Sequence, residues 1–378
     1  MVERRDQLVL VLNAGSSSLR YQVIAVPAGQ RVAGGHVDRV GDAGHGAALD
    51  RVVTDITRSG LDSRLTAIGH RVVHGGARHR GPALVDDRLE ASVDQLARLA
   101  PLHNPSALEG IRRARQAFPH LPQVAVFDTA WFADLPEAAR TYAIDRDLAL
   151  QEEVRRYGMH GISHQYVTGL VARYVGRPAV DLDQIVLHLG NGASAAAVKG
   201  GRPVDTSMGM TPVEGLVMGT RSGDIDPGAL IHLLRHAGLD VDALDGLLQH
   251  RSGLQGLTGS SDFRDLESAL EAGDRSARLA YDVYCHRLRK YVGAYLAVLG
   301  GADTIAFTGG IGENVPRLRA DALAGLVALG VEIDPVRNHA ELEGPRVIST
   351  PDSGVTVLVV PTDEELAIAQ QAAELLDA

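Results

Sequence analysis

The chain of 378 residues is poor in several residue types, and each scarcity excludes a class of protein. Cysteine occurs once, at Cys285, so neither an intrachain disulfide nor a cluster of thiolate metal ligands can form. Lysine occurs only at Lys199 and Lys290, and no basic segment carries interleaved aromatic residues, so nucleic-acid binding is not expected. No stretch approaches the roughly 20 apolar residues of a membrane-spanning helix. The first residues are charged and lack the apolar core of a signal peptide, which predicts a cytoplasmic protein.

The remaining composition is that of a globular protein, with 45% hydrophobic residues, 22% charged residues and a net charge of −10. The length predicts roughly two domains. Apolar strand-like runs alternate with helical patterns, which predicts an α/β fold. The predicted strands cover residues 8–12, 66–73, 123–127, 184–189, 304–307 and 355–360. The predicted helices cover much of residues 89–118, 164–175, 227–248, 265–299, 317–329 and 364–376. Cys285 lies within such a helical repeat, which indicates a buried small side chain rather than a reactive thiol.

Two segments about half a chain apart resemble each other. Residues 11–18 read VLNAGSSS and residues 186–194 read VLHLGNGAS. Each is an apolar strand, a polar residue and a turn of small residues, followed by a second strand-like run. The echo suggests two related domains, but a strand followed by glycine is common in α/β proteins, so the echo alone leaves duplication open.

Polar residues follow several predicted strands, as Asn13 and Asp128 do. In open α/β sheets, ligands bind beyond the carboxyl ends of the strands. Turns of small residues at 13–18, 188–194 and 309–314 allow backbone N–H groups to approach an anion. Tight turns alone also favour glycine, but three such turns indicate a polyphosphate. None of them matches the P-loop or the dinucleotide-binding pattern, so the sequence predicts nucleotide phosphate binding in another fold.

Three oxygen-bearing residues and two arginines are candidates for the chemistry. Asn13, Asp128 and Glu364 stand at strand ends and carry the oxygen donors that Mg²⁺ prefers. The alternatives are a helix N-cap for Asp128 and a first-turn helix residue for Glu364. Arg71 lies in an apolar strand before paired glycines, and Arg221 lies among glycines and small residues. A solvated surface arginine needs no such setting, so both are predicted to bind anions.

The histidines of the segment YGMHGISH raise the question of a metal site. His160 and His164 are four residues apart, but Gly161 and the lack of an HExxH glutamate argue against zinc. His160 is a candidate donor to developing negative charge. We expect structural roles for His164, His70 and His74. No GxSxG elbow is present, which disfavours a serine hydrolase.

Taken together, these motifs resemble the acetate kinases, in the right order and over nearly the whole chain. The motifs are NAGSSSLRY, GHRVVHGG, APLHNP, FDTAWF, YGMHGISH, HLGNGAS, TSMGMTPVEGLVMGTRSGDIDPG, GSSDFRDL, FTGGIGEN and PTDEELAIA. The resemblance implies an α/β fold of two duplicated actin-like (ribonuclease H-like) domains with a cleft between them. We expect residues 1–145 and 362–378 to form the first domain. Residues 146–361 then form the second domain, with most nucleotide contacts.

The resemblance also implies an activity. It is the reversible, Mg²⁺-dependent, direct in-line transfer of the ATP γ-phosphoryl group to acetate, which gives acetyl phosphate and ADP, with Mn²⁺ as an alternative ion. A homodimer is implied as well. One alternative is a short-chain acyl kinase that prefers propionate or butyrate. A second is a nucleotide-switched binding protein of the actin or heat-shock type, which would have no need of the motifs around Arg71 and His160.

Residue roles follow from the same resemblance. Asn13 and Glu364 match metal positions, and Asp128, His160 and Arg221 match catalytic ones. The implied substrate contacts are Arg71, Val73, Leu102, Met159 and Pro212. The implied nucleotide contacts are Arg20, His188, Leu189, Gly190, Asn191, Gly192, Asp262, Phe263, Arg264, Gly310, Ile311, Gly312, Glu313 and Asn314. The family assigns acid or base chemistry to Asp128, but an ionised acetate needs no deprotonation, so we favour a role in positioning metal and substrate.

Two positions depart from the family pattern. Arg20 stands where the family usually has lysine, so its contact with phosphate is the least secure of the set. Met159 stands where the family usually has phenylalanine, and a flexible thioether can reshape an apolar pocket. A one-carbon difference in such a pocket discriminates by only ~1–3 kcal/mol. Appreciable use of propionate is therefore expected.

Overall fold

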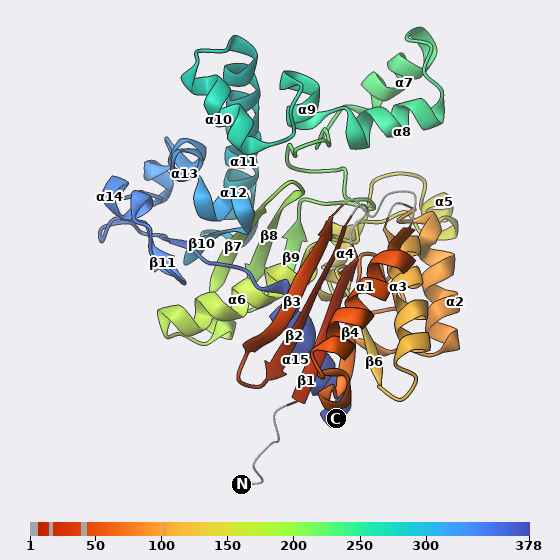
Figure 1. Cartoon of the computed structure of the whole chain (residues 1–378). Coiled ribbons are helices and arrows are strands. Elements are labelled where there is room, and N and C mark those ends of the chain that lie inside the picture. Colours follow the sequence, from red (N-terminus) through yellow and green to blue (C-terminus); the bar gives the residue numbers. More distant parts are fainter. Residues whose placement is uncertain (1–6, 15–17, 39–43, 102) are drawn as a thin grey trace. The chain divides into compact units, whose positions relative to one another are not determined.

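The computed structural model describes residues 7–14, 18–38, 44–101 and 103–378 (Figure 1). The chain forms two compact units. The first comprises Met1–Ala133, Met159–Ser163 and Asp363–Ala378, and the second comprises Asp134–Gly158 and His164–Thr362. The boundaries expected near residues 145 and 362 stay predictions about where each domain begins and ends.

The first unit contains a mixed sheet of six strands in the order β3-β2-β1-β4-β6-β5. The strands are β1 (Gln7–Ala14), β2 (Ser18–Val26), β3 (Gln30–Asp38), β4 (Ala67–Val72), β5 (Ala83–Leu84) and β6 (Gln123–Phe127). Strands β1, β2 and β3 form an antiparallel meander. Strand β4 runs parallel to β1, β6 runs parallel to β4, and β5 is antiparallel to β6. The main helices are α1 (Gly44–Arg58), α2 (Asp87–Gln95), α3 (Asn104–Ala117) and α15 (Glu364–Asp377).

The second unit repeats this arrangement, with the order β11-β12-β10-β7-β8-β9. The strands are β7 (Asp183–Leu189), β8 (Ala193–Lys199), β9 (Arg202–Thr206), β10 (Thr304–Thr308), β11 (Arg346–Val347) and β12 (Thr356–Val359). Strands β7, β8 and β9 are antiparallel, β10 and β12 extend the sheet in parallel, and β11 closes it antiparallel. Strand for strand, this is the topology of the first sheet. The two segments that resemble each other in sequence follow equivalent strands, β1 and β7, and each leads into an antiparallel partner, β2 or β8. The expected pair of related α/β domains is therefore confirmed.

Among the described residues, eleven α-helices, some of them short, belong wholly or mostly to the second unit. They are α4 (Glu137–Arg140), α5 (Arg146–Gln151), α6 (Gly161–Val175), α7 (Pro227–His236), α8 (Val241–His250), α9 (Gly253–Thr258), α10 (Phe263–Glu271), α11 (Arg275–Leu299), α12 (Gly309–Asn314), α13 (Pro316–Leu323) and α14 (Pro335–His339). The first three residues of α6 pack with the first unit. Helix α11 is the longest and packs against β7 and β8. None of the helices in the described part of the chain has the length and hydropathy needed to span a bilayer.

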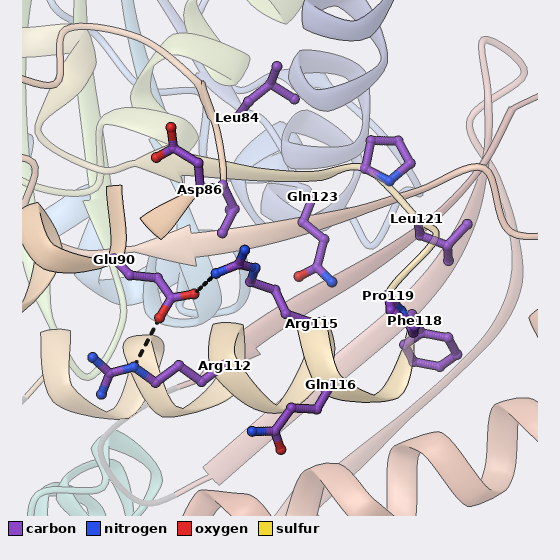
Figure 2. Close-up of a pocket in the computed structure, with 12 residues that line it drawn as sticks. Leu84, Asp86, Glu90, Arg112, Arg115, Gln116, Phe118, Pro119, Leu121 and Gln123 are labelled. Carbon is purple, nitrogen blue, oxygen red and sulfur yellow. Dashed lines mark hydrogen bonds and ion pairs between the residues drawn. The ribbon is translucent and has the colours of Figure 1, made fainter. Parts of the chain in front are cut away.

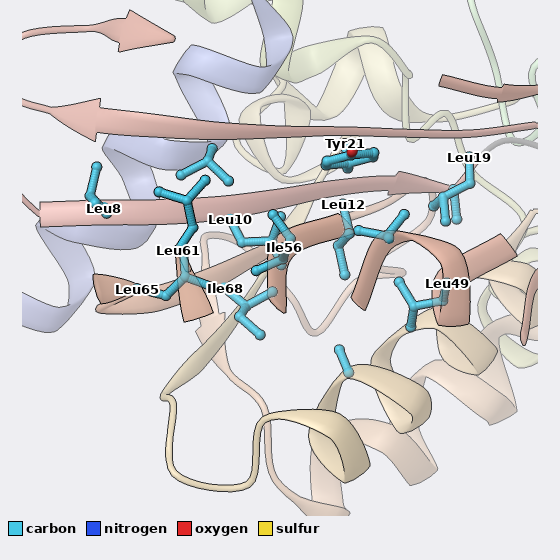
Figure 3. Packing of buried hydrophobic residues seen from close by; sticks show 14 of the residues in the cluster. Leu8, Leu10, Leu12, Leu19, Tyr21, Leu49, Ile56, Leu61, Leu65 and Ile68 are labelled. Carbon is cyan, nitrogen blue, oxygen red and sulfur yellow. The ribbon is translucent and has the colours of Figure 1, made fainter. Parts of the chain in front are cut away.

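The first sheet is covered on both faces. Leu8, Leu10 and Leu12 alternate along β1 and pack with Leu49 and other buried residues of α1 (Figure 3). On the opposite face the C-terminal helix α15 lies directly on β4. A Cβ atom at Gly69 of β4 would lie 2.7 Å from Ile368 Cγ2, so glycine allows this close approach. The C-terminal helix therefore belongs to the first unit, and its N-terminus is brought to that sheet.

Four predicted helices are interrupted. The helical pattern at 89–118 divides into α2, a 3₁₀ turn and α3, and the pattern at 227–248 divides into α7 and α8. The pattern at 317–329 divides into α13 and a 3₁₀ turn at Val327–Leu329. The pattern at 265–299 breaks at Gly273, which adopts a positive φ of 79°.

For the last helix, Thr362 followed three residues later by Glu365 predicts a capping box with Thr362 as the N-cap. That prediction is wrong, because the N-cap of α15 is Asp363, whose carboxylate accepts from Leu366 N at 2.8 Å. Aspartate is at least as good a cap as threonine.

The single cysteine is buried within α11, as expected. Burial raises the pKa of the Cys285 thiol to about 12, so the group is not a thiolate near neutral pH.

Candidate functional site

A polar cluster occupies one edge of the first sheet, where three parallel strands end. Asn13 comes from the end of β1, Arg71 from the end of β4, and Asp128 follows β6. Arg71 donates to Asp128 through Nη2–Oδ2 at 2.6 Å and Nε–Oδ1 at 3.3 Å, and to Asn13 Oδ1 through Nη1 at 3.2 Å. Glu364, in the first turn of α15, lies 3.8 Å from Arg71 Nε. Four of the predicted site residues are therefore neighbours in space.

Arg71 retains part of its hydrogen-bonding capacity in this cluster. A guanidinium has five N–H donors, and the contacts to Asp128 and Asn13 use three of them, which leaves two. Burial lowers the pKa of Arg71, but the charges of Asp128 and Glu364 outweigh burial and raise it above its ordinary value. The guanidinium is thus a permanent cation with two N–H groups that no described residue accepts from.

Negative charges outnumber positive charges around Arg71. Asp128, Glu364 and the buried Glu365 face this one partly buried cation. Arg20 lies on β2, and its Nη1 is 3.8 Å from Glu365, but its side chain is 56% exposed. Asn13 Nδ2 donates to Glu365 at 3.3 Å, which turns Asn13 Oδ1 toward Arg71. An excess of carboxylates with an amide oxygen is a donor set suited to a hard divalent cation.

His160 is held beside Asp128 by the backbone. The N–H of Gly161 donates to the Asp128 carbonyl at 2.9 Å. A Cβ atom at Gly161 would lie 2.1 Å from that oxygen, so only glycine fits there. His160 has a positive φ of 58°, a conformation that is costly for a residue with a side chain. Strained backbone of this kind is often found at functional sites, and here it places His160 in the same unit as Arg71 and Asp128.

The other histidines near these motifs are structural, as expected. His70 is buried and its Nε2 lies 2.8 Å from Gln123 Oε1. Burial lowers the pKa of His70 to about 4, so the ring is neutral near pH 7. His74 is buried, and its Nδ1 accepts from Gly76 N at 3.0 Å. His164 is buried with Nε2 2.7 Å from Ser194 Oγ, and burial lowers its pKa well below the usual range.

The second unit carries the predicted nucleotide turns at the ends of β7 and β10. Gly190 N donates to Gly192 O at 3.0 Å, which closes the turn after β7. Gly309 has a φ of 77°, and the turn after β10 continues into α12. The carboxylate of Glu313 accepts from Gly309 N at 2.8 Å and from Thr362 N at 3.3 Å. That side chain therefore stabilises the turn from within, and Gly310 at its tip is exposed.

Arg221 lies on a loop that contacts one of these turns. Gly219, two residues before it, donates its N–H to the Asn191 carbonyl at 3.0 Å. Arg221 Nη1 donates to the Pro212 carbonyl at 3.3 Å. Among the described residues no carboxylate lies within ion-pair distance of Arg221, and burial lowers its pKa. A half-buried cation without a counterion is suited to bind an anionic ligand.

The segment from Asp262 to Arg264 has side chains both on the surface and in the core. Asp262 caps α10 by accepting from Arg264 N at 2.9 Å, and it pairs with the Arg264 guanidinium at 2.6 Å. The Arg264 side chain is 88% exposed. Phe263 is buried and packs edge-on against Tyr284, with ring centroids 5.6 Å apart. Its side chain therefore anchors the segment in the core, a role that the sequence alone did not indicate.

The predicted acyl-pocket residues are mostly buried. Val73 and Met159 are buried in the first unit, and Pro212 is buried in the second. Leu102 and residues 15–17 lie outside the described residues. Within the described ranges no group of three or more histidine, cysteine or carboxylate side chains is arranged to hold a metal alone.

A hollow of about 820 Å³ in the first unit lies apart from this cluster (Figure 2). Its two arginines, Arg112 and Arg115, are both paired with Glu90 (Figure 2). Gln123 also lines it, and the Gln123 amide oxygen is the partner of His70. The lining contains none of the predicted ligand residues, so the hollow is not the candidate site.

Comparison with known proteins decides the family. The profile of the acetokinase family matches residues 31–370. An acetate kinase of Leifsonia xyli subsp. xyli (strain CTCB07) is 55% identical over 393 residues, which cover 98% of this chain and 99% of that protein. The chain belongs to the acetokinase family.

Solved acetokinase structures support the same assignment. The crystal structure of Porphyromonas gingivalis acetate kinase matches with a TM-score of 0.92 and 39% identity, covering 98% of this chain and 100% of that one. A propionate kinase from Francisella tularensis subsp. tularensis SCHU S4 matches with a TM-score of 0.91 and 35% identity, over 97% and 99% of the two chains. The expected fold of the acetokinase family is thereby confirmed. The roles of individual residues stay predictions.

Proposed function

We propose that the chain is an acetate kinase that transfers the γ-phosphoryl group of ATP to acetate and, in reverse, phosphorylates ADP with acetyl phosphate. The observation that carries this proposal is the environment of Arg71. A guanidinium anchored by Asp128 and Asn13 keeps two N–H donors that no described residue accepts from, in a unit that also buries Val73 and Met159. A small carboxylate with a methyl group fits this chemistry. Membership of the acetokinase family supports the same reaction.

Arg71 is the proposed carboxylate ligand of the acyl substrate. Two remaining N–H groups on one planar guanidinium can hold both oxygens of acetate. Asp128 and Asn13 fix the plane of that guanidinium before the substrate arrives, which lowers the entropic cost of orienting acetate for attack. Val73 and Met159 are the proposed apolar contacts of the methyl group in the first unit, with Leu102 and Pro212 proposed as further contacts.

Asn13 and Glu364 are the proposed protein ligands of Mg²⁺, with Mn²⁺ as an alternative ion. The surplus of carboxylates around Arg71, among them Glu364 in the first turn of α15, fits a hard cation. Asn13 Oδ1 accepts from Arg71 Nη1, so Arg71 and the ion would have to share that oxygen. When bound, Mg²⁺ would neutralise charge on the phosphate oxygens. Asp128 fixes Arg71 and thereby the substrate. We do not assign it the role of a base, because acetate is already ionised and its carboxylate is the nucleophile.

His160 and Arg221 are the proposed donors to the phosphoryl group as negative charge spreads over its oxygens. Phosphoryl transfer depends mainly on positioning and on charge stabilisation. Arg221 has no described carboxylate partner to be displaced, so its charge is available to phosphate without a competing ion pair. The turns at 188–192 and 310–314 and the segment at 262–264 are the proposed nucleotide contacts, with Arg20 as a further one.

The experiment that tests the proposal is a stoichiometric assay of the purified chain. ATP, Mg²⁺ and acetate should give equal amounts of ADP and acetyl phosphate, the latter trapped with hydroxylamine as acetohydroxamate. Omission of acetate should leave ATP nearly intact. ADP release that does not depend on acetate, with no hydroxamate, would instead indicate a nucleotide-switched ATPase of the actin or heat-shock type.

A short-chain acyl kinase that prefers propionate is the second candidate. Met159 in place of the usual phenylalanine favours it. The match to a propionate kinase at 35% identity shows that such an activity occurs on this fold, although the Leifsonia xyli and Porphyromonas gingivalis acetate kinases are more similar, at 55% and 39% identity. The assay is therefore repeated with propionate and butyrate, and kcat/KM decides the preferred substrate. A homodimer and a cytoplasmic location are further predictions of the family resemblance, and sedimentation of the purified chain tests the first.

A further inference from the structure

We propose that Arg287 and Tyr291 of α11 are positioning residues that hold Arg221 in place for catalysis. The inference rests on the role proposed above for Arg221. Neither residue belongs to the set of predicted ligand residues, and both lie on a long helix whose sequence pattern indicates only core packing. Their partners are the two ends of the loop that carries Arg221.

The segment from Gly215 to Asp224 is a closed loop. At its ends, Asp224 N donates to the Gly215 carbonyl at 3.0 Å. In the other direction, Gly215 N donates to Asp224 Oδ1 at 2.8 Å. Gly215 has a φ of 108°, and a Cβ atom there would lie 2.6 Å from Ser207 O. The first and last residues of the loop, Gly215 and Asp224, are thus held directly against each other, and we call this pair the neck of the loop.

Arg287 and Tyr291 hold both residues of the neck. Arg287 Nη1 donates to Gly215 O at 2.8 Å and Nη2 donates to Asp224 O at 3.1 Å. Tyr291 donates its hydroxyl to Asp224 Oδ2 at 2.9 Å. Arg287 and Tyr291 are four residues apart on α11 and therefore project from the same side of the helix. A rigid helix thus fixes the neck from one direction with three hydrogen bonds.

The interior of the loop leaves little freedom for Arg221 once the neck is fixed. Met218 N donates to Arg221 O at 3.2 Å across the loop. A Cβ atom at Gly253 of α9 would lie 2.2 Å from Met218 O and 2.6 Å from Arg221 O, so α9 packs directly on this turn. The position of the Arg221 backbone is therefore set by the neck on one side and by α9 on the other.

The charges favour a positioning role over direct ligand binding by Arg287. Its guanidinium donates to two carbonyls and lies 3.6 Å from Asp224 Oδ2. Among the described residues, Arg221 donates to a single carbonyl, that of Pro212, and no carboxylate lies within ion-pair distance of it. Arg287 is therefore occupied by two carbonyls and a carboxylate, whereas Arg221 keeps most of its N–H donors and its charge for a ligand.

The test compares two tyrosine-to-phenylalanine variants on the same helix. Tyr291→Phe removes the hydroxyl that holds Asp224. Tyr281→Phe is the matched control, because its hydroxyl donates to Asp321 at 2.7 Å and has no contact with the loop. We expect Tyr291→Phe to lower kcat by roughly tenfold, the effect of about 1.4 kcal/mol on the barrier. The KM values for ATP and acetate should change by less than about twofold, and Tyr281→Phe should leave kcat unchanged.

A double-mutant cycle shows whether the effect passes through Arg221. In an Arg221→Ala background, Tyr291→Phe should cause no further loss, because residues that act through one another are not additive. Arg287→Lys, which cannot donate to both carbonyls in the same geometry, should behave as Tyr291→Phe does. An equal loss of kcat in both tyrosine variants, or an undiminished loss in the Arg221→Ala background, would overturn the inference.

Hydrogen exchange separates this inference from the proposed function. Tyr291→Phe should speed amide exchange of Met218 and Gly219 relative to wild type, and Tyr281→Phe should not. That result is independent of any assay of acetyl phosphate. Failure of the wild-type chain to form acetyl phosphate would refute the proposed function alone. Unchanged amide exchange of Met218 and Gly219 in Tyr291→Phe would refute only the inference that Arg287 and Tyr291 hold the loop of Arg221.

Discussion

Gly219 and Asn191 are in direct backbone contact: the Gly219 N–H donates to the Asn191 carbonyl at 3.0 Å, and a Cβ atom at Gly219 would lie 1.9 Å from Asn191 Oδ1. The contact joins the loop of Arg221 to the turn after β7, which the sequence predicts to bind nucleotide phosphate. Two elements that lie some 30 residues apart in sequence thus form one surface of the second unit. Their spacing is set by the absence of a side chain at Gly219.

Substitution of Gly219 by alanine should therefore impair both elements together. The added methyl group must displace the Asn191 amide or the loop, since a contact of 1.9 Å cannot exist. We expect kcat to fall and the KM for ATP to rise, each by roughly tenfold or more, with a smaller change in the KM for acetate. Steady-state kinetics with each substrate varied in turn measures this pattern.

Gly246→Ala is the matched control for Gly219→Ala. Gly246 lies in α8, and no atom would lie within 4 Å of its Cβ. Alanine in a helix is more stable than glycine by about 1 kcal/mol, so this variant should melt slightly higher and keep its activity. Normal kinetics for Gly219→Ala would contradict this prediction. They would show that the contact between the loop of Arg221 and the turn after β7 is not needed for activity.

Many strands and helices of this fold can be predicted from local patterns of the sequence. The strand at Gln123–Phe127 lies where its apolar run predicts, and the resemblance of the two glycine turns identifies equivalent corners of two sheets. Strand β3 is not predicted from the sequence, because its paired glycines weaken the strand pattern. Its extended conformation depends on its antiparallel hydrogen bonds with β2. The two residues of β5 are too few to form a pattern.

Residues of the candidate site can be proposed from the sequence where their local setting is unusual, but a residue in an ordinary setting can be recognised only from its contacts in the fold. Arg71 and Arg221 stand out in sequence because small and apolar residues surround them. Arg287 does not, since in a helix rich in arginine it looks like a solvated residue, and only the fold shows that it donates to Gly215 and Asp224. For Phe263 the motif predicts a nucleotide contact, and the fold adds a second feature that the motif does not indicate, since the ring is buried in the core.

Arg71→Ala and Arg221→Ala should impair different steps. Loss of Arg71 removes the proposed carboxylate ligand, so the KM for acetate should rise by roughly tenfold to a hundredfold, as expected for charge-assisted hydrogen bonds. Loss of Arg221 removes charge stabilisation at the phosphoryl group, so kcat should fall by about 10²–10³. Arg278→Ala is the control, since that arginine is exposed and pairs with Asp282 on the same helix. Near-normal activity of both site variants would refute the assigned roles.

Met159→Phe should sharpen the preference for acetate. Met159 is buried, and a rigid aromatic ring in its place leaves less adaptable space for an acyl chain. We expect the ratio of kcat/KM for acetate over propionate to rise by about 10- to 100-fold, which corresponds to ~1–3 kcal/mol. The ratio is measured for wild type and variant under one set of conditions. An unchanged ratio would show that Met159 does not contact the acyl group.

His70 should make folding stability sensitive to mild acid. Burial lowers its pKa to about 4 in the folded state, against about 6.5 in the unfolded chain. Between these values the unfolded state binds more protons, so the free energy of unfolding falls as pH decreases from 6.5 toward 4. The contribution of His70 between pH 7 and pH 5 is about 2 kcal/mol by this linkage. Urea unfolding at both pH values measures the change.

Replacement of His70 isolates this contribution from that of other titrating groups. His70→Asn keeps a group able to bond Gln123 but cannot take up a proton, so it should lose about 2 kcal/mol less than wild type between pH 7 and pH 5. His120→Asn removes an exposed imidazole of the same unit and should lose as much as wild type. If His70→Asn and wild type lost the same free energy, the His70 ring would have to take up its proton equally in the folded and unfolded states. Such a result would mean that the ring is hydrated in the folded state, and the buried hydrogen bond to Gln123 would then be wrong.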